Sequence, residues 1–237
     1  NEISKDEIKS CFPGAWYRKA VSSKDYWLGF EGIVTLPEFY PDEDRFNIVD
    51  DHVYPGEMIK KYLDTPSIYV GGSSDYENDI GLGWFRGIED YQTKRVSSNK
   101  ITFRPFWRYI FIGEDGYEKN IYAMTKLEEV EYYFFPGDKV KITLCCLEEN
   151  FLHFRLDLIE PTNIPKYIEI RNKLNLPNNL PSSLVVDKII APGVGTRKTE
   201  YKRVNAIDQY HNEGKPSQAT KAFTLPSTWH EAYLFRL

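Results

Sequence analysis

The sequence contains few cysteines, and their spacing matches no known structural site. Only 3 of the 237 residues are cysteines, namely Cys11, Cys145 and Cys146. This number excludes a disulfide framework, and no pair has the spacing of metal ligands. Cys145 and Cys146 are neighbours in a strand-like segment, so their side chains point to opposite faces. We expect Cys146 to pack in the core, and a single bridge between Cys11 and Cys145 remains open.

Long apolar runs and dense basic runs are also absent. No stretch reaches the about 18 consecutive apolar residues that a membrane-spanning helix needs, so we expect no membrane insertion. The net charge of −5 and the pI of about 5.5 give no general attraction for phosphate backbones, so we expect no nucleic-acid partner. No Asn-X-Ser/Thr sequon occurs, which disfavours heavy glycosylation. The chain starts at Asn1, which is typical of a processed end, and we expect an extracellular or cell-surface location.

Familiar catalytic and metal-binding motifs are missing as well. The 4 histidines stand singly, without H-x-H or H-E-x-x-H spacing, and no G-x-S-x-G, P-loop or G-x-G-x-x-G turn occurs. Two acidic groups, Asp42-Glu43-Asp44 and Asp50-Asp51, leave Ca²⁺ binding open, although such clusters are most often solvated loops. We therefore expect no cofactor.

Aromatic residues, by contrast, are abundant. Tyr, Phe and Trp make up 15% of the chain, and hydrophobic residues make up 41%. Aromatic side chains suit pleated, half-buried surfaces, so the composition favours β-structure. No repeat, low-complexity segment or linker divides the chain. We predict a single domain over residues 1–237, in which residues 1–14 form a loose N-terminal arm.

Strand-like segments separated by turn signals run along the whole chain. Asp115-Gly116 and Pro136-Gly137 are hairpin and turn signals between such segments. In residues 138–147 apolar and polar side chains alternate, which is typical of an antiparallel strand with one wet face. The predicted strands are 15–20, 26–39, 68–70, 80–85, 101–112, 119–124, 130–135, 138–147, 151–159, 184–190, 199–207 and 229–237.

This pattern predicts an all-β fold. We expect a two-sheet antiparallel β-sandwich with one or two short helices in loops, the helices being residues 56–63 and 166–174. An orthogonal barrel is the alternative architecture. In either case the long loops lie at edges and ends, where binding groups gather.

The candidate site lies in the segment from Ser67 to Gly87, SIYVGGSSDYENDIGLGWFRG. Polar residues gather there in a loop between two strands, and the strand at 101–112 adds two arginines on one face. Aromatic rings stack on the apolar faces of sugars, and planar polar groups hydrogen-bond sugar hydroxyls, so this mixture favours carbohydrate binding. The predicted ligand-binding residues are Tyr76, Asn78, Asp79, Trp84, Arg104, Trp107 and Arg108.

These residues also have structural interpretations. Trp84 and Trp107 are alternatively core residues, and Arg104 and Arg108 are alternatively members of cross-strand ion pairs. A second polar cluster runs from Lys202 to Gln209 and continues at Asn212 and Glu213. It either completes the site or ties down crossing loops by hydrogen bonds, and we prefer the second interpretation.

Four sequence pieces carry a family resemblance. YVGG, DIGLGW, RPFWRYIFI and EYYFFPGDKVKITL, all within residues 69–144, together resemble the concanavalin A-like lectin and glucanase superfamily. Within it, the order GIVTLP, YVGG, DIGLGW, FFPGDKVKITL is similar to the glutamic peptidases. The resemblance implies a jelly-roll sandwich. For the peptidases it also implies a Gln and a Glu on facing strands that activate a water and stabilise an oxyanion.

This chain lacks the complete catalytic motif of either family. Asp79 stands at the position of the peptidase Gln, and no A-E-W-I-like segment supplies the Glu. The glucanase pattern E-x-D-x-(x)-E starts with Glu77-Asn78-Asp79, but Gly81 and Leu82 stand where its second Glu would follow.

These departures favour a non-catalytic, lectin-like module whose partner is a carbohydrate or glycoconjugate. One alternative is a hydrolase of glutamic-peptidase type with Asp79 in the catalytic position. Another is a structural or interaction module of a surface assembly. The sequence does not indicate an oligomeric state.

Overall fold

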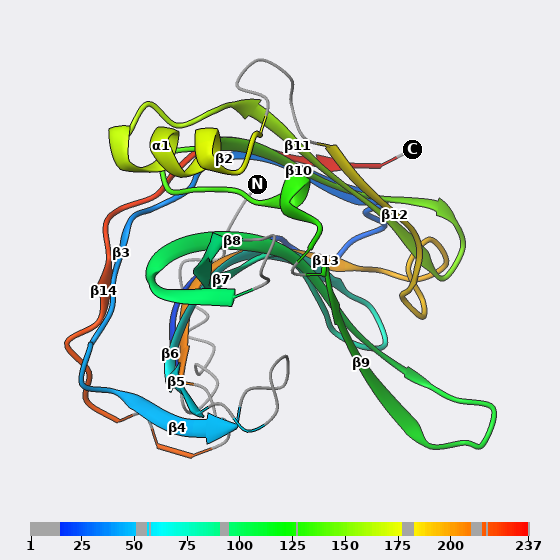
Figure 1. The fold of residues 1–237 in the computed structure, drawn as a ribbon. Coiled ribbons are helices and arrows are strands. Elements are labelled where there is room, and N and C mark those ends of the chain that lie inside the picture. The colour runs from blue at the N-terminus through cyan, green and yellow to red at the C-terminus, as the bar shows by residue number, and fades with distance from the viewer. Residues whose placement is uncertain are drawn as a thin grey trace.

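Two antiparallel sheets lie face to face in the computed structural model (Figure 1). The structure describes residues 15–50, 56, 58–90, 95–126, 128–176, 183–209, 215–216 and 218–236. The six-stranded sheet has the order β1 (Ala15–Val21), β13 (Glu200–Gln209), β6 (Asp64–Ser73), β7 (Asn78–Asp90), β8 (Arg95–Ile112) and β9 (Glu118–Met124). The five-stranded sheet has the order β12 (Ser183–Ile190), β11 (Phe151–Glu160), β10 (Lys139–Glu148), β2 (Gly29–Thr35) and β15 (Thr228–Phe235).

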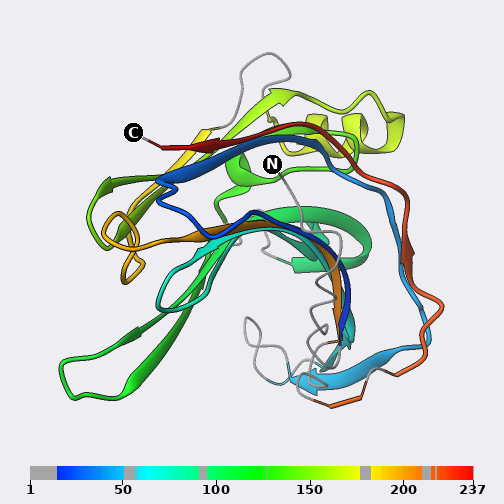
Figure 2. The same ribbon diagram turned by 180° about the vertical axis from the view of Figure 1, so that it is seen from behind.

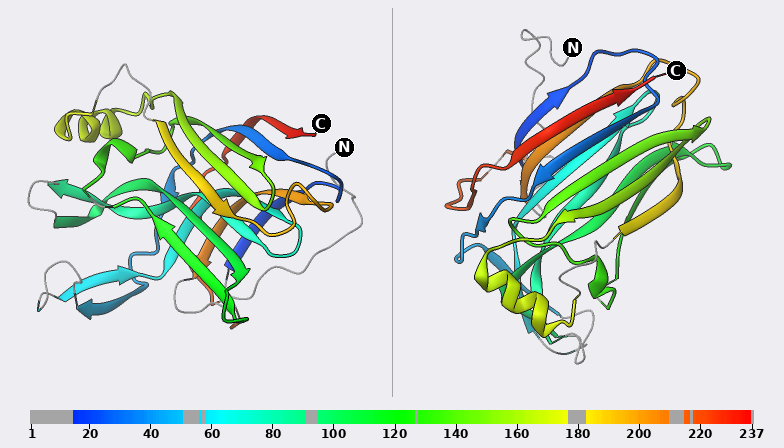
Figure 3. Two further views of the ribbon diagram at one scale, coloured as in Figure 1. Left: turned by 90° about the vertical axis from the view of Figure 1, so that its right-hand side faces the viewer. Right: turned by 90° about the horizontal axis from the view of Figure 1, so that it is seen from above.

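Among the residues that the structure describes, four short strands and two helical segments complete the fold. The strands form two small sheets, β3 (Phe39–Tyr40) with β14 (Phe223–Thr224), and β4 (Phe46–Asp50) with β5 (Met58–Tyr62). The helical segments are the 3-10 helix η1 (Val130–Tyr132) and the α-helix α1 (Pro165–Lys173). Seen from above, α1 lies at one end of the five-stranded sheet (Figure 3). No helix among the described residues is long and apolar enough to cross a membrane.

The space between the two sheets is filled by apolar side chains from both. Alternation along each strand places every second residue on the inner face, which is why the strands build one continuous core. The core includes Phe30, Val34, Ile68, Val70, Ile80, Leu82, Phe103, Ile142, Leu144, Phe154 and Leu156. The predicted two-sheet antiparallel β-sandwich is therefore confirmed.

The six-stranded sheet is strongly bent, and its outer face lies on the inside of the bend (Figures 1 and 2). A second, smaller apolar cluster lies on this outer face, made of Tyr69, Phe106, Val204 and Ala206. The hairpin of β8 and β9 extends away from the body beside it (Figure 1). The outer face thus has its own apolar floor, separate from the core between the sheets.

Two of the predicted elements are wrong. Residues 58–62 of the predicted helix at 56–63 form β5, which pairs with β4 and brings the Phe46 and Tyr62 rings to 5.8 Å. A helix of two turns is marginal in water, so strand pairing prevails. The predicted strand at 130–135 is instead η1 followed by one bridge between Phe103 and Phe134. Phe134 packs between the sheets, whereas Tyr133 and Phe135 on either side of it pack in the cluster of Tyr167.

Other predicted features are confirmed. Gly137 has φ of +86°, as a type II turn at Pro136-Gly137 requires. The helix predicted at 166–174 is α1. Cys145 and Cys146 are free thiols, and Cys146 packs against the core. The predicted arm at 1–14, Cys11, Asp51, Asn212 and Glu213 lie outside the described residues.

Candidate functional site

A row of side chains crosses the outer face of the six-stranded sheet at right angles to its strands. Tyr122 of β9 pairs with Arg108 of β8, and Arg108 pairs with Asp79 of β7. On the next strand Gly71 follows the pair Val70–Ile80, and Gly71 pairs with Lys202 of β13. Residues directly opposite each other in antiparallel strands point to the same face, so these side chains share one surface.

Ion pairs join the polar part of this row. The Lys202 Nζ lies 2.5 Å from the Asp79 Oδ1, and an Arg108 guanidinium nitrogen donates to the Asp79 Oδ2 at 3.0 Å. Lys202 also pairs with Glu77, and the Arg108 Nε donates to the Asn120 Oδ1 at 3.1 Å. The side chains of Lys202 and Asp79 are only 9% and 14% exposed, and reduced exposure to water strengthens such pairs.

Gly71 is what allows Lys202 to reach Asp79 across an intervening strand. A Cβ at position 71 would lie 1.9 Å from the Asn78 carbonyl oxygen and 3.2 Å from the Lys202 Cε. With glycine there, the lysine side chain lies flat over β6, its Nζ 5.4 Å from the centre of the Tyr69 ring. Gly71, the first glycine of the YVGG segment, is therefore a steric requirement of the ion-pair cluster.

Glu77 stands at the edge of this cluster as an ionised carboxylate. Burial, the largest single effect, would raise its pKa, but the charge and hydrogen bond of Lys202 together with the charges of Lys19 and Arg108 outweigh it. The pKa of Glu77 is consequently lowered. Three cationic side chains thus act on one carboxylate.

The aromatic part of the row is an exposed ring on a buried one. Phe106 is 7% exposed and stacks against Tyr122, with ring centres 5.7 Å apart and planes at 18°. Tyr122 is 60% exposed. Tyr69 meets Phe106 edge to face at 6.0 Å, which fixes the floor. One face of the Tyr122 ring is thus held firmly while the ring stays open to solvent.

Tyr17 of β1, Tyr69 of β6 and Asp208 of β13 lie next to this row on the same face of the sheet. The Tyr17 hydroxyl donates to the Asp208 Oδ1 at 3.3 Å, and the Ser67 hydroxyl lies 3.5 Å from the other Asp208 oxygen. Burial, and after it the charge of Asp208, raises the pKa of Tyr17. Tyr17 and Tyr69 therefore remain protonated and serve as hydrogen-bond donors.

Of the seven sequence-predicted residues, Asp79 and Arg108 lie together in the row. Arg104 lies on the same face of β8 but is buried, and burial lowers its pKa. Trp107 points to the other face and packs against the core. Tyr76 is half-buried in the loop between β6 and β7.

Two predicted residues belong to the interior. Trp84 is 5% exposed and meets the Phe39 and Phe103 rings edge to face at 4.9 and 5.0 Å. It therefore fills the core, which was the alternative interpretation. Asn78 is 1% exposed, and its Oδ1 accepts the Gly72 N–H at 2.9 Å. That hydrogen bond closes the turn between β6 and β7.

Three residues of the site, Lys202, Glu77 and Tyr122, are not among the seven that the sequence predicts. Lys202 belongs to the second polar cluster, whose predicted role is to tie down crossing loops, and the structure pairs it with Glu77 and Asp79 of the candidate segment. Tyr122 lies in a correctly predicted strand, 119–124, but its partner across the sheet depends on register. A register counted from a three-residue loop, Glu114 to Gly116, is the one signal that places it opposite Arg108.

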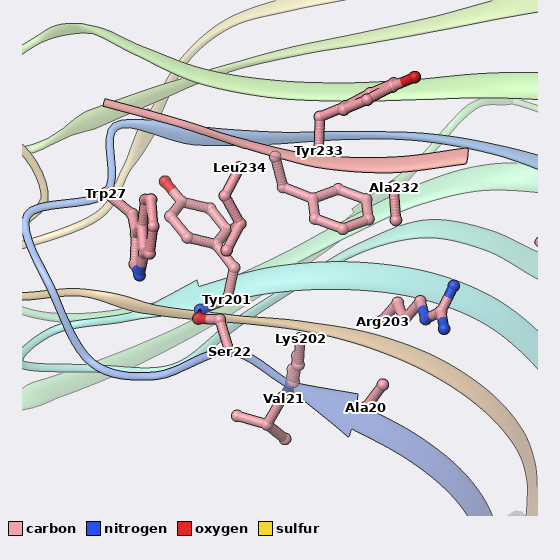
Figure 4. A pocket seen from close by; sticks show the side chains of 11 residues that line it. Ala20, Val21, Ser22, Trp27, Tyr201, Lys202, Arg203, Ala232, Tyr233 and Leu234 are labelled. Atoms are coloured by element: carbon pink, nitrogen blue, oxygen red, sulfur yellow. Dashed lines mark hydrogen bonds between the residues drawn. The ribbon is translucent and has the colours of Figure 1, made fainter. Parts of the chain in front are cut away.

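A separate cavity of about 260 Å³ lies between the sheets, where β1 and β13 face β2 and β15. Figure 4 shows Trp27, Tyr201 and Leu234 side by side at one end of it and Arg203 towards the other. None of the seven predicted residues lines this cavity. Within the described part of the chain, no group of three or more His, Cys, Asp or Glu side chains is placed to hold a metal ion.

No protein-family model and no curated protein matches the sequence. Among solved structures, the chain is similar to scytalido-glutamic peptidase bound to a peptide-based transition state analog, with a TM-score of 0.44, 8% identity, and coverage of 92% of this chain and 78% of that one. It is similar to SCP-B of the eqolisin family of peptidases, with a TM-score of 0.41, 10% identity and coverage of 92% and 78%. It is also similar to a glycoside hydrolase family 16 endo-glucanase from Bacteroides ovatus, with a TM-score of 0.39, 10% identity and coverage of 92% and 74%. These are the two groups that the sequence motifs resemble.

Proposed function

We propose that the protein is a non-catalytic module that binds a carbohydrate or glycoconjugate on the outer face of the six-stranded sheet. The observation that supports this best is the exposed Tyr122 ring, stacked on Phe106 and directly beside Arg108. An aromatic face backed by a buried ring offers a rigid platform for the apolar face of a pyranose. The planar guanidinium and the neighbouring amide of Asn120 offer donors to hydroxyl groups.

The row is long enough for more than one sugar ring. From Tyr122 to Asp79 it spans two strand spacings, about 10 Å. The polar groups along it are already oriented by ion pairs, which lowers the entropy lost on binding. The inside of the sheet's bend is where an extended ligand contacts most of this row.

Binding is favoured over hydrolysis by the ion-pair partners of Glu77 and Asp79. A hydrolytic pair needs one carboxyl group protonated as acid while the other is ionised. Lys202 bridges Glu77 and Asp79, Arg108 also pairs with Asp79, and the lowered pKa of Glu77 favours its carboxylate over the acid. Asp79 has no side-chain amide N–H to donate, so it does not replace the amide of a Gln at an oxyanion.

The test is a glycan array followed by titration of the best ligand against two matched variants. Tyr122→Ala removes the platform and is expected to weaken binding about tenfold, the equivalent of about 1.4 kcal/mol for one stacked ring. Tyr117→Ala is the control, because Tyr117 is 72% exposed on the turn of the same hairpin and away from the row. It is expected to bind as the wild type does.

Two results contradict the proposal. A blank array would remove carbohydrate binding altogether. Equal losses in the two variants would show that the ligand contacts the hairpin elsewhere than at the row.

A further inference from the structure

The carboxylate of Glu77 occupies a position where positive charge converges. It pairs with the Nζ of Lys202, and its lowered pKa reflects the charges of Lys202, Lys19 and Arg108. The Glu77 side chain is 47% exposed, whereas Lys202 is 9% exposed. Glu77 therefore approaches a nearly buried lysine from the solvent side.

Without Glu77, the two cations Lys202 and Arg108 would face a single carboxylate, that of Asp79. Asp79 accepts ion pairs from both Lys202 and Arg108, so one carboxylate serves two cations. Glu77 supplies the second negative charge. If its side chain turns away, the row presents one carboxylate and two cations, which is an attractive environment for an external anion.

The backbone around Glu77 permits such an exchange. Residues 74–76 form a bend, Glu77 makes a single bridge to Ser73, and the regular ladder of β7 begins at Asn78. A rotation of the Glu77 side chain thus breaks no pairing of β7 with β6 or β8. Asn78 next to it is anchored by its bond to Gly72, so the loop keeps its shape.

We propose that the row recognises an acidic sugar, whose carboxylate replaces that of Glu77 on Lys202 while a sugar ring stacks on Tyr122. This inference rests on the proposed function. The lysine Nζ lies at Asp79, so the distance from the ring platform to the anion position is about two strand spacings, or about 10 Å. That length is about two pyranose rings along a chain, so it fits a carboxylate on the second sugar from the stacked one. In the absence of ligand, Glu77 acts as an internal competitor.

A matched pair of ligands separates charge from shape. Cellotetraose and its counterpart oxidised at C6 to the tetraglucuronate have the same linkage and differ in their carboxylates. Affinities are measured by calorimetry at low and high salt. The wild type is expected to bind the acidic tetramer more tightly, and this advantage is expected to shrink at high salt because exposed charges are screened.

Three variants locate the effect. Glu77→Gln keeps the side-chain shape and removes the competing charge, and it is expected to raise the ratio of acidic to neutral affinity about tenfold. Lys202→Met is expected to reduce that ratio to about one. Asp75→Asn is the control, because Asp75 lies in the same loop but pairs with Arg197 at 2.6 Å. It is expected to leave the ratio as in the wild type.

The outcomes distinguish the two proposals. Equal affinity for both tetramers in the wild type and in Glu77→Gln, with a loss in Tyr122→Ala, overturns the acidic-sugar inference and keeps the proposed function. An acidic preference that survives Lys202→Met also overturns it, since the anion then binds elsewhere. If neither tetramer nor any glycan on the array binds, the proposed function fails first.

Discussion

Asp138 is the most deeply buried charged residue of the described chain and joins three segments. It follows the Pro136-Gly137 turn and is 0% exposed. Its carboxylate accepts the Phe135 and Thr162 N–H groups, both at 2.7 Å, and pairs with Arg171 at 2.6 Å. Asp138 therefore holds in place both the Pro136-Gly137 turn and the segment around Thr162 that leads into α1.

Asp138→Ala is expected to lower the free energy of unfolding by about 3–5 kcal/mol. The loss follows because Arg171, itself 2% exposed, would keep a buried charge without its partner. Urea denaturation followed by circular dichroism measures it. Asp115→Ala is the control, since its pair with Lys119 is exposed and is expected to contribute little to stability. Similar losses in both variants would contradict this account of Asp138.

The same residue predicts a pH dependence of stability. Burial raises the pKa of Asp138 from 3.8 to about 6, although Arg171 and the Phe135 and Thr162 N–H groups oppose the rise. The folded chain thus binds a proton at a pH at which the unfolded chain releases it. The contribution of Asp138 to stability is complete below pH 3.8 and is lost as the pH rises through about 6.

Asp138→Asn removes this titration, which allows a direct comparison. The unfolding free energy of the wild type minus that of Asp138→Asn is expected to grow as the pH falls from 7 towards 3.8. Denaturation curves at several pH values measure the difference. A difference that is constant or that falls on acidification would show that the Arg171 pair, not burial, governs the pKa.

Two glycines of the outer face differ in what a side chain would meet. A Cβ at Gly71 would lie 1.9 Å from the Asn78 carbonyl oxygen, whereas at Gly83 the nearest atom, of the Phe106 ring, is 3.4 Å away. Gly71→Ala is therefore expected to destabilise the fold by about 1–3 kcal/mol and to displace Lys202. Gly83→Ala, the control in the same sheet, is expected to change stability by less than about 1 kcal/mol. Thermal unfolding of both variants tests this, and equal effects would refute it.

At the scale of elements, α1 depends on its contacts rather than on its own sequence. Its N-cap, Ile164, makes no capping hydrogen bond through its side chain. Tyr167 is 3% exposed and packs on the Phe135 ring at 6.0 Å, and the Arg171 guanidinium lies 5.1 Å from the same ring. A helix of 9 residues is marginal in isolation, so docking holds it.

Tyr167→Ala is expected to loosen α1 without unfolding the sheets. Loss of the buried ring removes about 3–5 kcal/mol of packing, most of it between α1 and the turn before β10. Hydrogen exchange is expected to speed up in α1 and to stay slow in β10 and β11. Lys173→Ala is the control, because its pair with Glu169 is exposed. Unchanged exchange in Tyr167→Ala would show that α1 is held by other contacts.

At the scale of the whole molecule, both sheets contribute to one core. Trp84 of the six-stranded sheet and Leu156 of the five-stranded sheet belong to the same apolar cluster. The prediction of a single domain over residues 1–237 therefore has a cooperative consequence. The two sheets are expected to unfold together, since neither buries its inner face alone.

Leu156→Ala tests this cooperativity. Leu156 is 0% exposed, and its truncation is expected to cost about 2–5 kcal/mol. Within each protein, tryptophan fluorescence and far-UV circular dichroism are expected to give the same transition midpoint, and the midpoint of the variant is expected to be lower than that of the wild type. Two separated transitions would contradict the single-domain prediction. Val185→Ala is the control, because Val185 is exposed on β12.

The sequence by itself determined the fold class and most of the strands. Period-two alternation, as in residues 138–147, fixes which side chains face the core, and Gly and Pro at turns fix where strands end. These signals are local, which is why the sandwich, the Pro136-Gly137 turn and α1 are predictable. The helix at 56–63 and the strand at 130–135 fail because both segments are short, and partners distant in sequence decide their conformation.

Only the tertiary structure decided the composition of the site. Asp79 and Arg108 are recognisable as polar residues on strands, but Lys202 reaches them from β13 and Tyr122 stands beside them because of the register between β8 and β9. The sequence also does not separate Trp84, which fills the core, from a tryptophan that faces a ligand. Strand order and register join residues more than 100 positions apart, such as Glu77 and Lys202, and no local pattern encodes that juxtaposition.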